Sequence, residues 1–265
     1  MKIGFFDSGL GGLFLLKKVV KALPQYDYLF LGDLKNSPYG SRSPQAVYDL
    51  TCRAVEHLFK NDCQLVILAC NTATILALRK IQREYLPANY PDRRVLGVLV
   101  PTLEEAIEQG FKRIGVLATA ATVKSEVYVK EIKKINKHIK IFQSAAPLLV
   151  PLAENNALHL AGPILKEYLR PLLNKKMEAL ILGCTHYPIL KKAIKEIVGE
   201  KVKIISQDEI MPKKIAEYLV RHPEIEENIS RNKKVAIEVT DLNDDFCRTA
   251  RKWFGKDISL RLVSY

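Results

Sequence analysis

The sequence predicts an α/β fold built from two pseudo-symmetric, doubly wound domains with mainly parallel sheets. Short apolar runs alternate with helical patterns along most of the 265 residues, as expected for βαβ units. One strand-and-loop unit, at residues 65–72, is repeated at residues 179–186, and each copy carries a cysteine. A second apolar run, at residues 2–6, is echoed at residues 113–117 with nearly the same offset. We therefore expect two similar halves that face each other across a cleft.

The predicted strands are short apolar runs that end at polar or turn residues. They lie at residues 3–6, 28–31, 65–69, 94–99, 113–117, 139–142, 179–182, 202–205 and 235–240. Helical patterns at residues 12–22, 44–60 and 72–85 follow the first three strands. A loop that contains Pro38-Tyr39-Gly40 leads into the second of these helices.

Two breaks in the pattern suggest the domain limits. They lie at Val100-Pro101 and at residues 206–209, where the second repeat begins and ends. The predicted first domain comprises residues 1–98 and 207–265, and the second comprises residues 99–206. In this arrangement the C-terminal segment returns to complete the first domain.

Composition indicates an ordinary globular protein of the cytoplasm. Apolar residues make up 48% of the chain and charged residues 26%. Apolar runs stay well short of the roughly 20 residues that cross a bilayer, and we expect no signal peptide and no membrane association. The five cysteines are odd in number, which favours free thiols. Their spacing is not that of a zinc site, so no metal is expected.

The net charge of +12 raises the question of a nucleic-acid partner. The lysines, however, are spread through amphipathic helical patterns such as residues 130–135 and 191–196. Solvated helix faces account for most of them, so a nucleic-acid partner is not favoured. A basic protein also attracts anions, which would help an acidic substrate to reach a cleft.

Four polar clusters follow predicted strands, at residues 7–9, 70–74, 119–122 and 184–186. Ligands of α/β sheets bind beyond the carboxyl ends of strands, where helix N-termini and hydroxyls suit carboxylates. This inventory favours a small dicarboxylate or an amino acid over a nucleotide. The plainer interpretation is that Asp7-Ser8, Thr72 and Thr122 are helix caps. Residues 9–12, which are rich in glycine, lack the lysine and the spacing of a Walker motif.

The occurrence of a cysteine in both repeated units, Cys70 and Cys184, is the main indication of catalytic activity. Thiols on opposite sides of one carbon could remove a proton from one face and return one to the other, as a cofactor-independent racemase does. An ordinary thiol has a pKa of about 8.5, so it must be activated for this task. From the residues alone, other interpretations stay open: two packing cysteines, a cysteine hydrolase that uses Cys184 and His186, or a basic binding protein without catalysis.

Three blocks of the sequence resemble the signature blocks of the glutamate racemases. They are residues 6–12, 69–73 and 182–188, with further agreement at residues 38–40, 119–125 and 150–154. The resemblance runs in order over roughly residues 1–205. The chain departs from the family pattern at residues 35–37, at Val100 and at residues 206–209.

The resemblance implies a racemase, independent of pyridoxal phosphate and without another cofactor, that interconverts L- and D-glutamate. It would supply peptidoglycan synthesis, and so cell-wall biogenesis and cell shape, as a cytoplasmic homodimer. Cys70 and Cys184 would exchange protons, Asp7 would assist Cys70, and His186 would assist Cys184. The family pattern places the following residues in the substrate pocket: Ser8, Pro38, Tyr39, Gly40, Asn71, Thr72, Thr119, Thr122 and Thr185.

Glu154 matches a position near the active site, whereas the four remaining histidines, His57, His138, His159 and His222, are expected at the surface. Cys52, Cys63 and Cys247 are expected to be packing residues. The nearest alternative is a related two-thiol enzyme with another substrate: an aspartate racemase, a hydantoin racemase or a decarboxylase.

Overall fold

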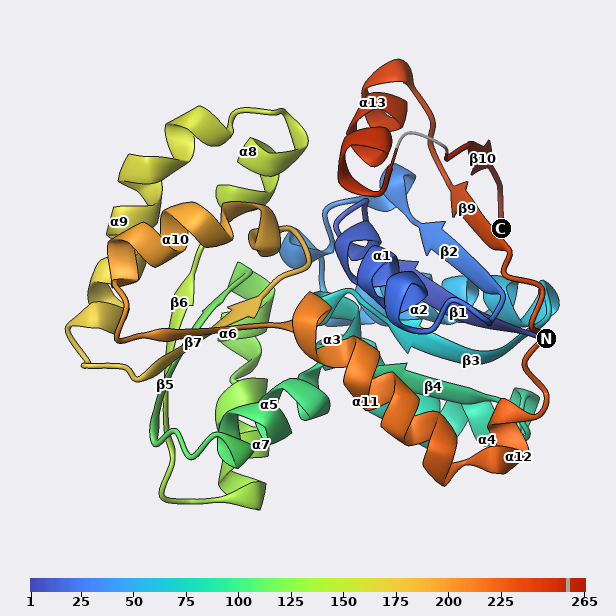
Figure 1. The fold of residues 1–265 in the computed structure, drawn as a ribbon, viewed down its shortest axis with the longest axis horizontal. Helices are drawn as coiled ribbons and strands as arrows, with labels where there is room; N and C mark the ends of the chain where they lie inside the picture. The colour runs from blue at the N-terminus through green and yellow to red at the C-terminus, as the bar shows by residue number, and fades with distance from the viewer. Residues whose placement is uncertain (256–257) are drawn as a thin grey trace.

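A computed structural model describes residues 1–255 and 258–265, which form two parallel sheets covered by helices (Figure 1). The larger sheet has six strands in the order β10-β9-β2-β1-β3-β4. Its strands are β1 (Lys2–Asp7), β2 (Tyr28–Gly32), β3 (Cys63–Leu68), β4 (Arg94–Gly97), β9 (Val235–Val239) and β10 (Leu260–Leu262). The smaller sheet has four strands in the order β6-β5-β7-β8. Its strands are β5 (Arg113–Ala118), β6 (Lys140–Ala145), β7 (Ala179–Gly183) and β8 (Lys203–Ser206).

The inner part of the large sheet repeats the strand order of the small one. The order β2-β1-β3-β4 corresponds to β6-β5-β7-β8, and all of these pairings are parallel. Cys70 follows β3, and Cys184 follows β7, which is the equivalent strand. The predicted fold class, with two similar α/β halves, is therefore confirmed.

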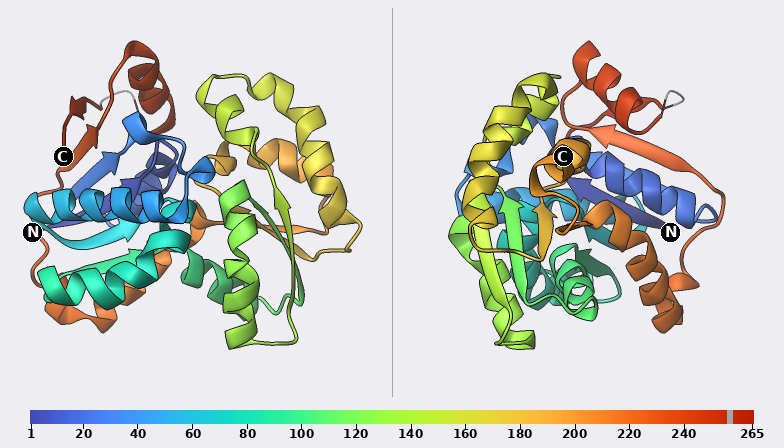
Figure 2. Two further views of the ribbon diagram at one scale, coloured as in Figure 1. Left: turned by 180° about the vertical axis from the view of Figure 1, so that it is seen from behind. Right: turned by 60° about the vertical axis from the view of Figure 1, so that its left-hand side comes forward.

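Helices cover both faces of each sheet, as the two turned views in Figure 2 show. Around the large sheet lie α1 (Gly12–Ala22), α2 (Pro44–Lys60), α3 (Asn71–Lys80), the π-helical turn η3 (Ile81–Tyr85), α4 (Leu86–Asn89), α11 (Gln207–Arg221), α12 (Pro223–Glu226) and α13 (Asp244–Trp253). Around the small sheet lie α5 (Leu99–Glu108), α6 (Ala120–Ser125), α7 (Val127–Ile135), α8 (Leu149–Glu154), α9 (Ala161–Leu173) and α10 (Lys191–Val198). Short 3₁₀ turns complete the set: η1 (Leu34–Asn36), η2 (Tyr39–Ser41), η4 (Leu158–Leu160) and η5 (Tyr187–Leu190).

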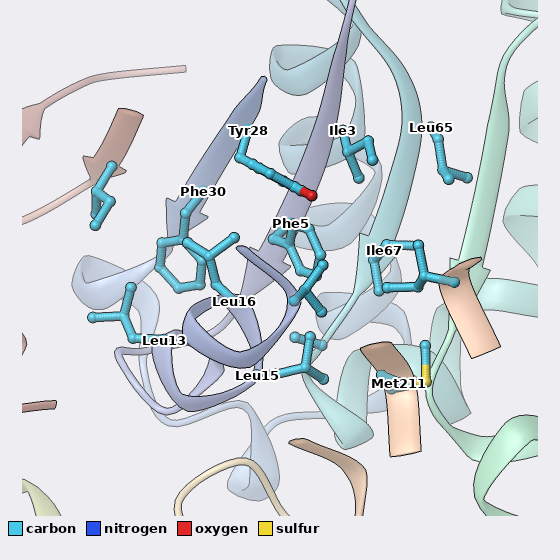
Figure 3. Packing of buried hydrophobic residues seen from close by; sticks show 14 of the residues in the cluster. Ile3, Phe5, Leu13, Leu15, Leu16, Tyr28, Phe30, Leu65, Ile67 and Met211 are labelled. Carbon is cyan, nitrogen blue, oxygen red and sulfur yellow. The ribbon is translucent and has the colours of Figure 1, made fainter. Parts of the chain in front are cut away.

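Apolar side chains at helical spacing fix α1 against the large sheet. Leu13 and Leu16 of α1 are fully buried against Phe5 and Phe30 of β1 and β2 (Figure 3). Met211 of α11 joins the same cluster. Burial of such side chains contributes about 1.5–3 kcal/mol each, which holds the loop after β1 in place at the sheet's carboxyl edge.

The chain passes between the two sheets twice. It crosses first through α5, which links β4 to β5, and then at the junction of β8 with α11. The prediction of a strand through residue 99 was wrong, because β4 ends at Gly97 and α5 begins at Leu99. Pro101 lies in the first turn of α5, where a missing N–H costs no helical hydrogen bond.

Within the described residues, no helix combines the length and apolar character needed to cross a membrane.

Candidate active site

A cavity of about 180 Å³ lies at the carboxyl ends of the strands and is lined by both Cys70 and Cys184. The two halves of the fold contribute to the same cavity, so the two thiols face one space, as the proposed chemistry requires. Most of the residues expected to bind substrate also line it: Ser8, Pro38, Tyr39, Gly40, Asn71, Thr72, Thr119 and Thr185. His186 lines it as well.

Cys70 lies at the N-terminus of α3, where its sulfur serves as the helix cap. Its Sγ accepts a hydrogen bond from the backbone N–H of Ala73 at 3.5 Å and lies 3.4 Å from Ser8 Oγ. Burial raises the pKa of the Cys70 thiol to about 12, and the Asp7 carboxylate adds to this rise, while the contacts with Ser8 and Ala73 oppose it. Cys70 is therefore a protonated thiol at neutral pH in this arrangement.

Asp7, the last residue of β1, is fully buried beside the cavity. Its Oδ2 accepts hydrogen bonds from the backbone N–H groups of Gly9 and Gly12, each at 3.2 Å, and its Oδ1 accepts one from Thr185 Oγ1 at 3.2 Å. Burial raises the pKa of Asp7, and the neighbouring His186 and the backbone donors only partly offset that rise. Asp7 is thus hydrogen-bonded to the Cys184 loop, whereas it acts on Cys70 through its charge.

Cys184 and His186 also line the cavity, and Glu154, which is not part of its lining, contacts His186. His186 Nδ1 lies 3.9 Å from Cys184 Sγ, and His186 Nε2 lies 3.0 Å from Glu154 Oε1. Burial alone would lower the pKa of His186, but its contacts with Cys184 and Glu154 outweigh burial and raise it to about 10. The imidazole is therefore an imidazolium at neutral pH, and it can stabilise negative charge that develops on the Cys184 sulfur.

The role of Glu154 can be tested through the titration of His186. Replacing Glu154 with glutamine should lower the pKa of His186 from about 10, because one of the two stabilising partners is lost. Since this pKa lies above the ordinary 6.5, the pairing stabilises the fold fully below pH 6.5, and that stabilisation is lost as the pH rises towards 10. In Glu154→Gln the loss should be smaller and complete at lower pH, which NMR titration of the His186 ring and urea unfolding across pH would measure.

A matched control is Glu224→Gln, since Glu224 lies 3.0 Å from the exposed His222. This change should leave the His186 titration as it is in the unaltered protein. An unchanged His186 titration in Glu154→Gln would show that the carboxylate does not hold the imidazolium.

Trp253 of α13 was not anticipated as a neighbour of the site. Its ring makes an edge-on contact with His186, with ring centroids 5.8 Å apart and an interplanar angle of 83°. Lys252 of the same helix donates to Asn156 Oδ1 at 3.2 Å, so the C-terminal part of the chain also reaches the loop after α8. Nothing in the local sequence around Trp253 indicated this contact.

Threonine hydroxyls join the two halves across the cavity. Thr72 Oγ1 and Thr119 Oγ1 are 3.2 Å apart, and Thr119 donates to Thr122 Oγ1 at 3.0 Å. Thr122 was expected in the substrate pocket, but it is fully buried behind Thr119 and is not part of the cavity lining. The reason is local, because Thr119 caps α6 and its hydroxyl accepts the N–H of Thr122.

The loop after β2 forms the other wall of the cavity. Tyr39 lines it, but its hydroxyl donates to Asp33 Oδ2 at 2.6 Å and is buried. A Cβ at Gly40 would lie 3.1 Å from the Cβ of Thr119, so this loop approaches the second half closely. Further lining residues were not predicted as substrate ligands, and they are small or apolar: Ser37, Ser41, Ala120, Ala146, Pro147, Val150 and Pro151.

The expectation that the other four histidines are surface residues was wrong for His57. Its side chain is only 13% exposed, and its Nε2 lies 2.6 Å from the buried carboxylate of Glu238. Cys63 is buried in the core around β3, as expected, while Cys52 and Cys247 are half-buried free thiols. In the part of the chain that the structure describes, no group of three or more His, Cys, Asp or Glu side chains could hold a metal ion.

The sequence of the chain is similar to those of known racemases. The pattern of the Asp/Glu/hydantoin racemase family matches residues 12–246. The glutamate racemase of Geobacter metallireducens is 37% identical over 259 residues, which cover 96% of this chain and 92% of that protein. The glutamate racemase of Roseobacter denitrificans is 38% identical over 236 residues, covering 84% of this chain and 87% of that one.

The fold is also similar to those of solved glutamate racemase structures. A glutamate racemase isoform from Bacillus anthracis superposes with a TM-score of 0.89 at 31% identity, covering 99% of this chain and 97% of that one. The glutamate racemase of Francisella tularensis, solved in complex with D-glutamate, also has a TM-score of 0.89, at 30% identity with the same coverage. The resemblance inferred from the three sequence blocks is confirmed.

Proposed function

The chain belongs to the Asp/Glu/hydantoin racemase family, and we propose that it interconverts L- and D-glutamate by means of Cys70 and Cys184, without a cofactor. The observation that carries this proposal is that the two thiols occupy equivalent positions in the two halves and line one cavity. A substrate carbon held between them is accessible from both faces.

In the proposed reaction, one cysteine acts as a thiolate and takes the proton from Cα of the substrate. The electron pair of the broken C–H bond stays on the substrate as a carbanion. The other cysteine, as a thiol, gives its proton to the opposite face and becomes the thiolate. The configuration at Cα is inverted, the number of protons is conserved, and the two cysteines have exchanged roles.

The neighbours of each thiol support these roles in different ways. The imidazolium of His186 offsets charge on Cys184, and Glu154 holds its ring in place. Because its pKa is raised to about 12, Cys70 keeps its proton at neutral pH. It is therefore available to protonate the substrate after deprotonation from the other side. In the reverse direction Cys70 is the base, and the capping N–H of Ala73 at the start of α3 then stabilises its charge.

The cavity also suits a substrate with two carboxylates. The hydroxyl-bearing residues Ser8, Thr72, Thr119 and Thr185 line it. Ser8 and Thr72 can turn their O–H groups to carboxylate oxygens without adding charge, while Thr119 and Thr185 donate to Thr122 and Asp7. Its volume of about 180 Å³ fits a small amino acid better than a nucleotide.

The proposal is tested with purified protein and L-glutamate in D2O, without added pyridoxal phosphate. We expect the optical rotation to fall to zero, while the NMR signal of the Cα proton disappears as deuterium enters. Parallel reactions with L-aspartate should be much slower. Rapid turnover of aspartate instead of glutamate would favour the aspartate racemase alternative, and a covalent acyl-enzyme found by mass spectrometry would favour a hydrolase.

We further propose that the enzyme supplies D-glutamate for peptidoglycan in the cytoplasm. Both reactive cysteines must remain unoxidised, which a reducing compartment ensures. We also propose a homodimer, in which the exposed apolar side chains of Leu148 and Leu160 are candidates for contact. The domain limits, residues 1–98 with 207–265 and residues 99–206, are part of the same proposal.

A further inference from the structure

A buried polar cluster joins the two halves of the fold directly behind the cavity. It consists of Asn71, Gln207 and Tyr128, which are 2%, 4% and 0% exposed. Asn71 is the first residue of α3 and directly follows Cys70. Gln207 is the first residue of α11, where the chain leaves the small sheet, and Tyr128 belongs to α7, which packs on that sheet.

The hydrogen bonds within this cluster are reciprocal. Asn71 Nδ2 donates to Gln207 Oε1 at 2.7 Å, and Gln207 Nε2 donates to Asn71 Oδ1 at 2.7 Å. The Tyr128 hydroxyl donates to the same Asn71 Oδ1 at 3.1 Å. Two amides paired in this way fix each other's distance and plane, because a shift of either side chain weakens both bonds.

The cluster also reaches the second cysteine. Gln207 lines a small void of about 10 Å³ together with Cys184 and Thr185. Tyr128 Oη would lie only 3.4 Å from a Cβ built on Gly183, the residue before Cys184. Two short paths therefore lead from Cys70 through Asn71 to the Cys184 loop, one through Gln207 and one through Tyr128.

We propose that Gln207 and Tyr128 are positioning residues that set the separation of the Cys70 and Cys184 sulfurs. This inference rests on the proposed two-thiol racemisation. Each cysteine belongs to a different half, so their spacing depends on contacts between the halves. Within the cluster, the bond from Tyr128 to Asn71 crosses between the halves, while Gln207 lies where the chain returns from the small sheet and holds Asn71, the residue after Cys70, beside the Cys184 loop.

Positioning and substrate binding predict different kinetics. A displacement of about 1 Å between reacting groups costs on the order of 10²-fold in rate. If the cluster sets the sulfur separation, its loss lowers kcat, while KM for glutamate changes little because the hydroxyls that line the cavity remain. If the cluster only shapes the part of the cavity lined by Asn71, its loss raises KM and leaves kcat unchanged.

The test uses Gln207→Glu and Tyr128→Phe, which preserve side-chain size. Glutamate at position 207 places a carboxyl oxygen where Nε2 now donates to Asn71, and phenylalanine at 128 removes the hydroxyl alone. For each variant we expect kcat for L-glutamate to fall by about tenfold or more, with KM within about twofold. In D2O, the ratio of deuterium exchange without inversion to racemisation should rise several-fold, because the second thiol is out of place.

Two matched controls make the same chemical changes away from the site. Gln64→Glu alters a side chain that is 4% exposed and donates to the carbonyl of Asp92 at 2.9 Å. Tyr28→Phe removes a hydroxyl that donates to the carbonyl of Leu23 at 2.6 Å. Both can reduce stability, but neither should change the kcat of the folded enzyme or the exchange ratio.

Each result has a defined meaning. If the unaltered protein does not racemise glutamate, the proposed function fails. If it does, and Gln207→Glu and Tyr128→Phe behave like their controls or change only KM, the positioning role is overturned. Circular dichroism of each variant identifies any that fail to fold, and Tyr128→Phe alone then still decides the question, since it removes one atom from a fully buried ring.

Discussion

Replacing either Cys70 or Cys184 with serine is expected to reduce racemisation by a factor on the order of 10³ or more. A serine hydroxyl is a far weaker acid than a thiol, so it cannot supply an anion to remove the Cα proton. Each variant removes the thiol that serves one face of the substrate Cα. The single thiol that remains is insufficient for inversion. Polarimetry with L-glutamate and with D-glutamate measures the loss.

Cys52→Ser serves as the control for this pair, because Cys52 is a half-buried free thiol in α2 that does not line the cavity. It should keep full activity. Deuterium exchange at Cα without inversion can persist in Cys70→Ser or Cys184→Ser and would show which face the remaining thiol serves. Full turnover by either variant would rule out the two-thiol mechanism.

The second large effect is expected at Gly11, where the loop after β1 approaches the Cys184 loop. A Cβ at position 11 would lie 2.6 Å from Thr185 Oγ1 and 2.7 Å from His186 Nδ1. Nδ1 is the atom that faces Cys184 Sγ, and Thr185 is the hydroxyl that donates to Asp7. Gly11→Ala must displace both side chains, so we expect kcat to fall by about tenfold to hundredfold. The free energy of unfolding should fall by about 1–3 kcal/mol.

Gly162→Ala is the matched control, since Gly162 lies in α9 and a Cβ there would meet nothing within 4 Å. Alanine is favoured over glycine within a helix by about 1 kcal/mol, so this variant should be as stable as the unaltered protein or more stable. Its kcat should not change. If Gly11→Ala retains the kcat of Gly162→Ala, the close approach of the two loops is not required for catalysis.

Much of the fold could be predicted because its strands are short apolar runs with clear ends. The repeated strand-and-loop unit correctly placed Cys70 and Cys184 after equivalent strands. β10 was missed because three residues hold no periodic signal, and this strand exists through its pairing with β9. β6 runs to Ala145, past the predicted end at residue 142, because a half-exposed edge strand tolerates the polar residues Gln143 and Ser144.

The site was predictable only where its residues lie close to the cysteines in sequence. His186 was found in this way, but its partners Glu154 and Trp253 come from α8 and α13, and only the fold brings them to the ring. Gln207 was singled out as a departure from the racemase pattern, yet its pairing with Asn71 could not be foreseen across 136 positions. The burial of His57 likewise depends on Glu238 of β9, a distant strand.

The matching strand orders of the two sheets have a consequence for the origin of the chain. Such a match is what duplication of a gene for one smaller unit would leave, with the second copy inserted into the first. In such an origin, a single unit with one thiol would have needed self-association to place another thiol opposite it. Fusion into one polypeptide would have let equivalent positions diverge: the residue two places after Cys70 is Thr72, whereas the residue two places after Cys184 is His186. The present asymmetry between the two thiols would then have been acquired after fusion, upon an architecture that began with identical partners.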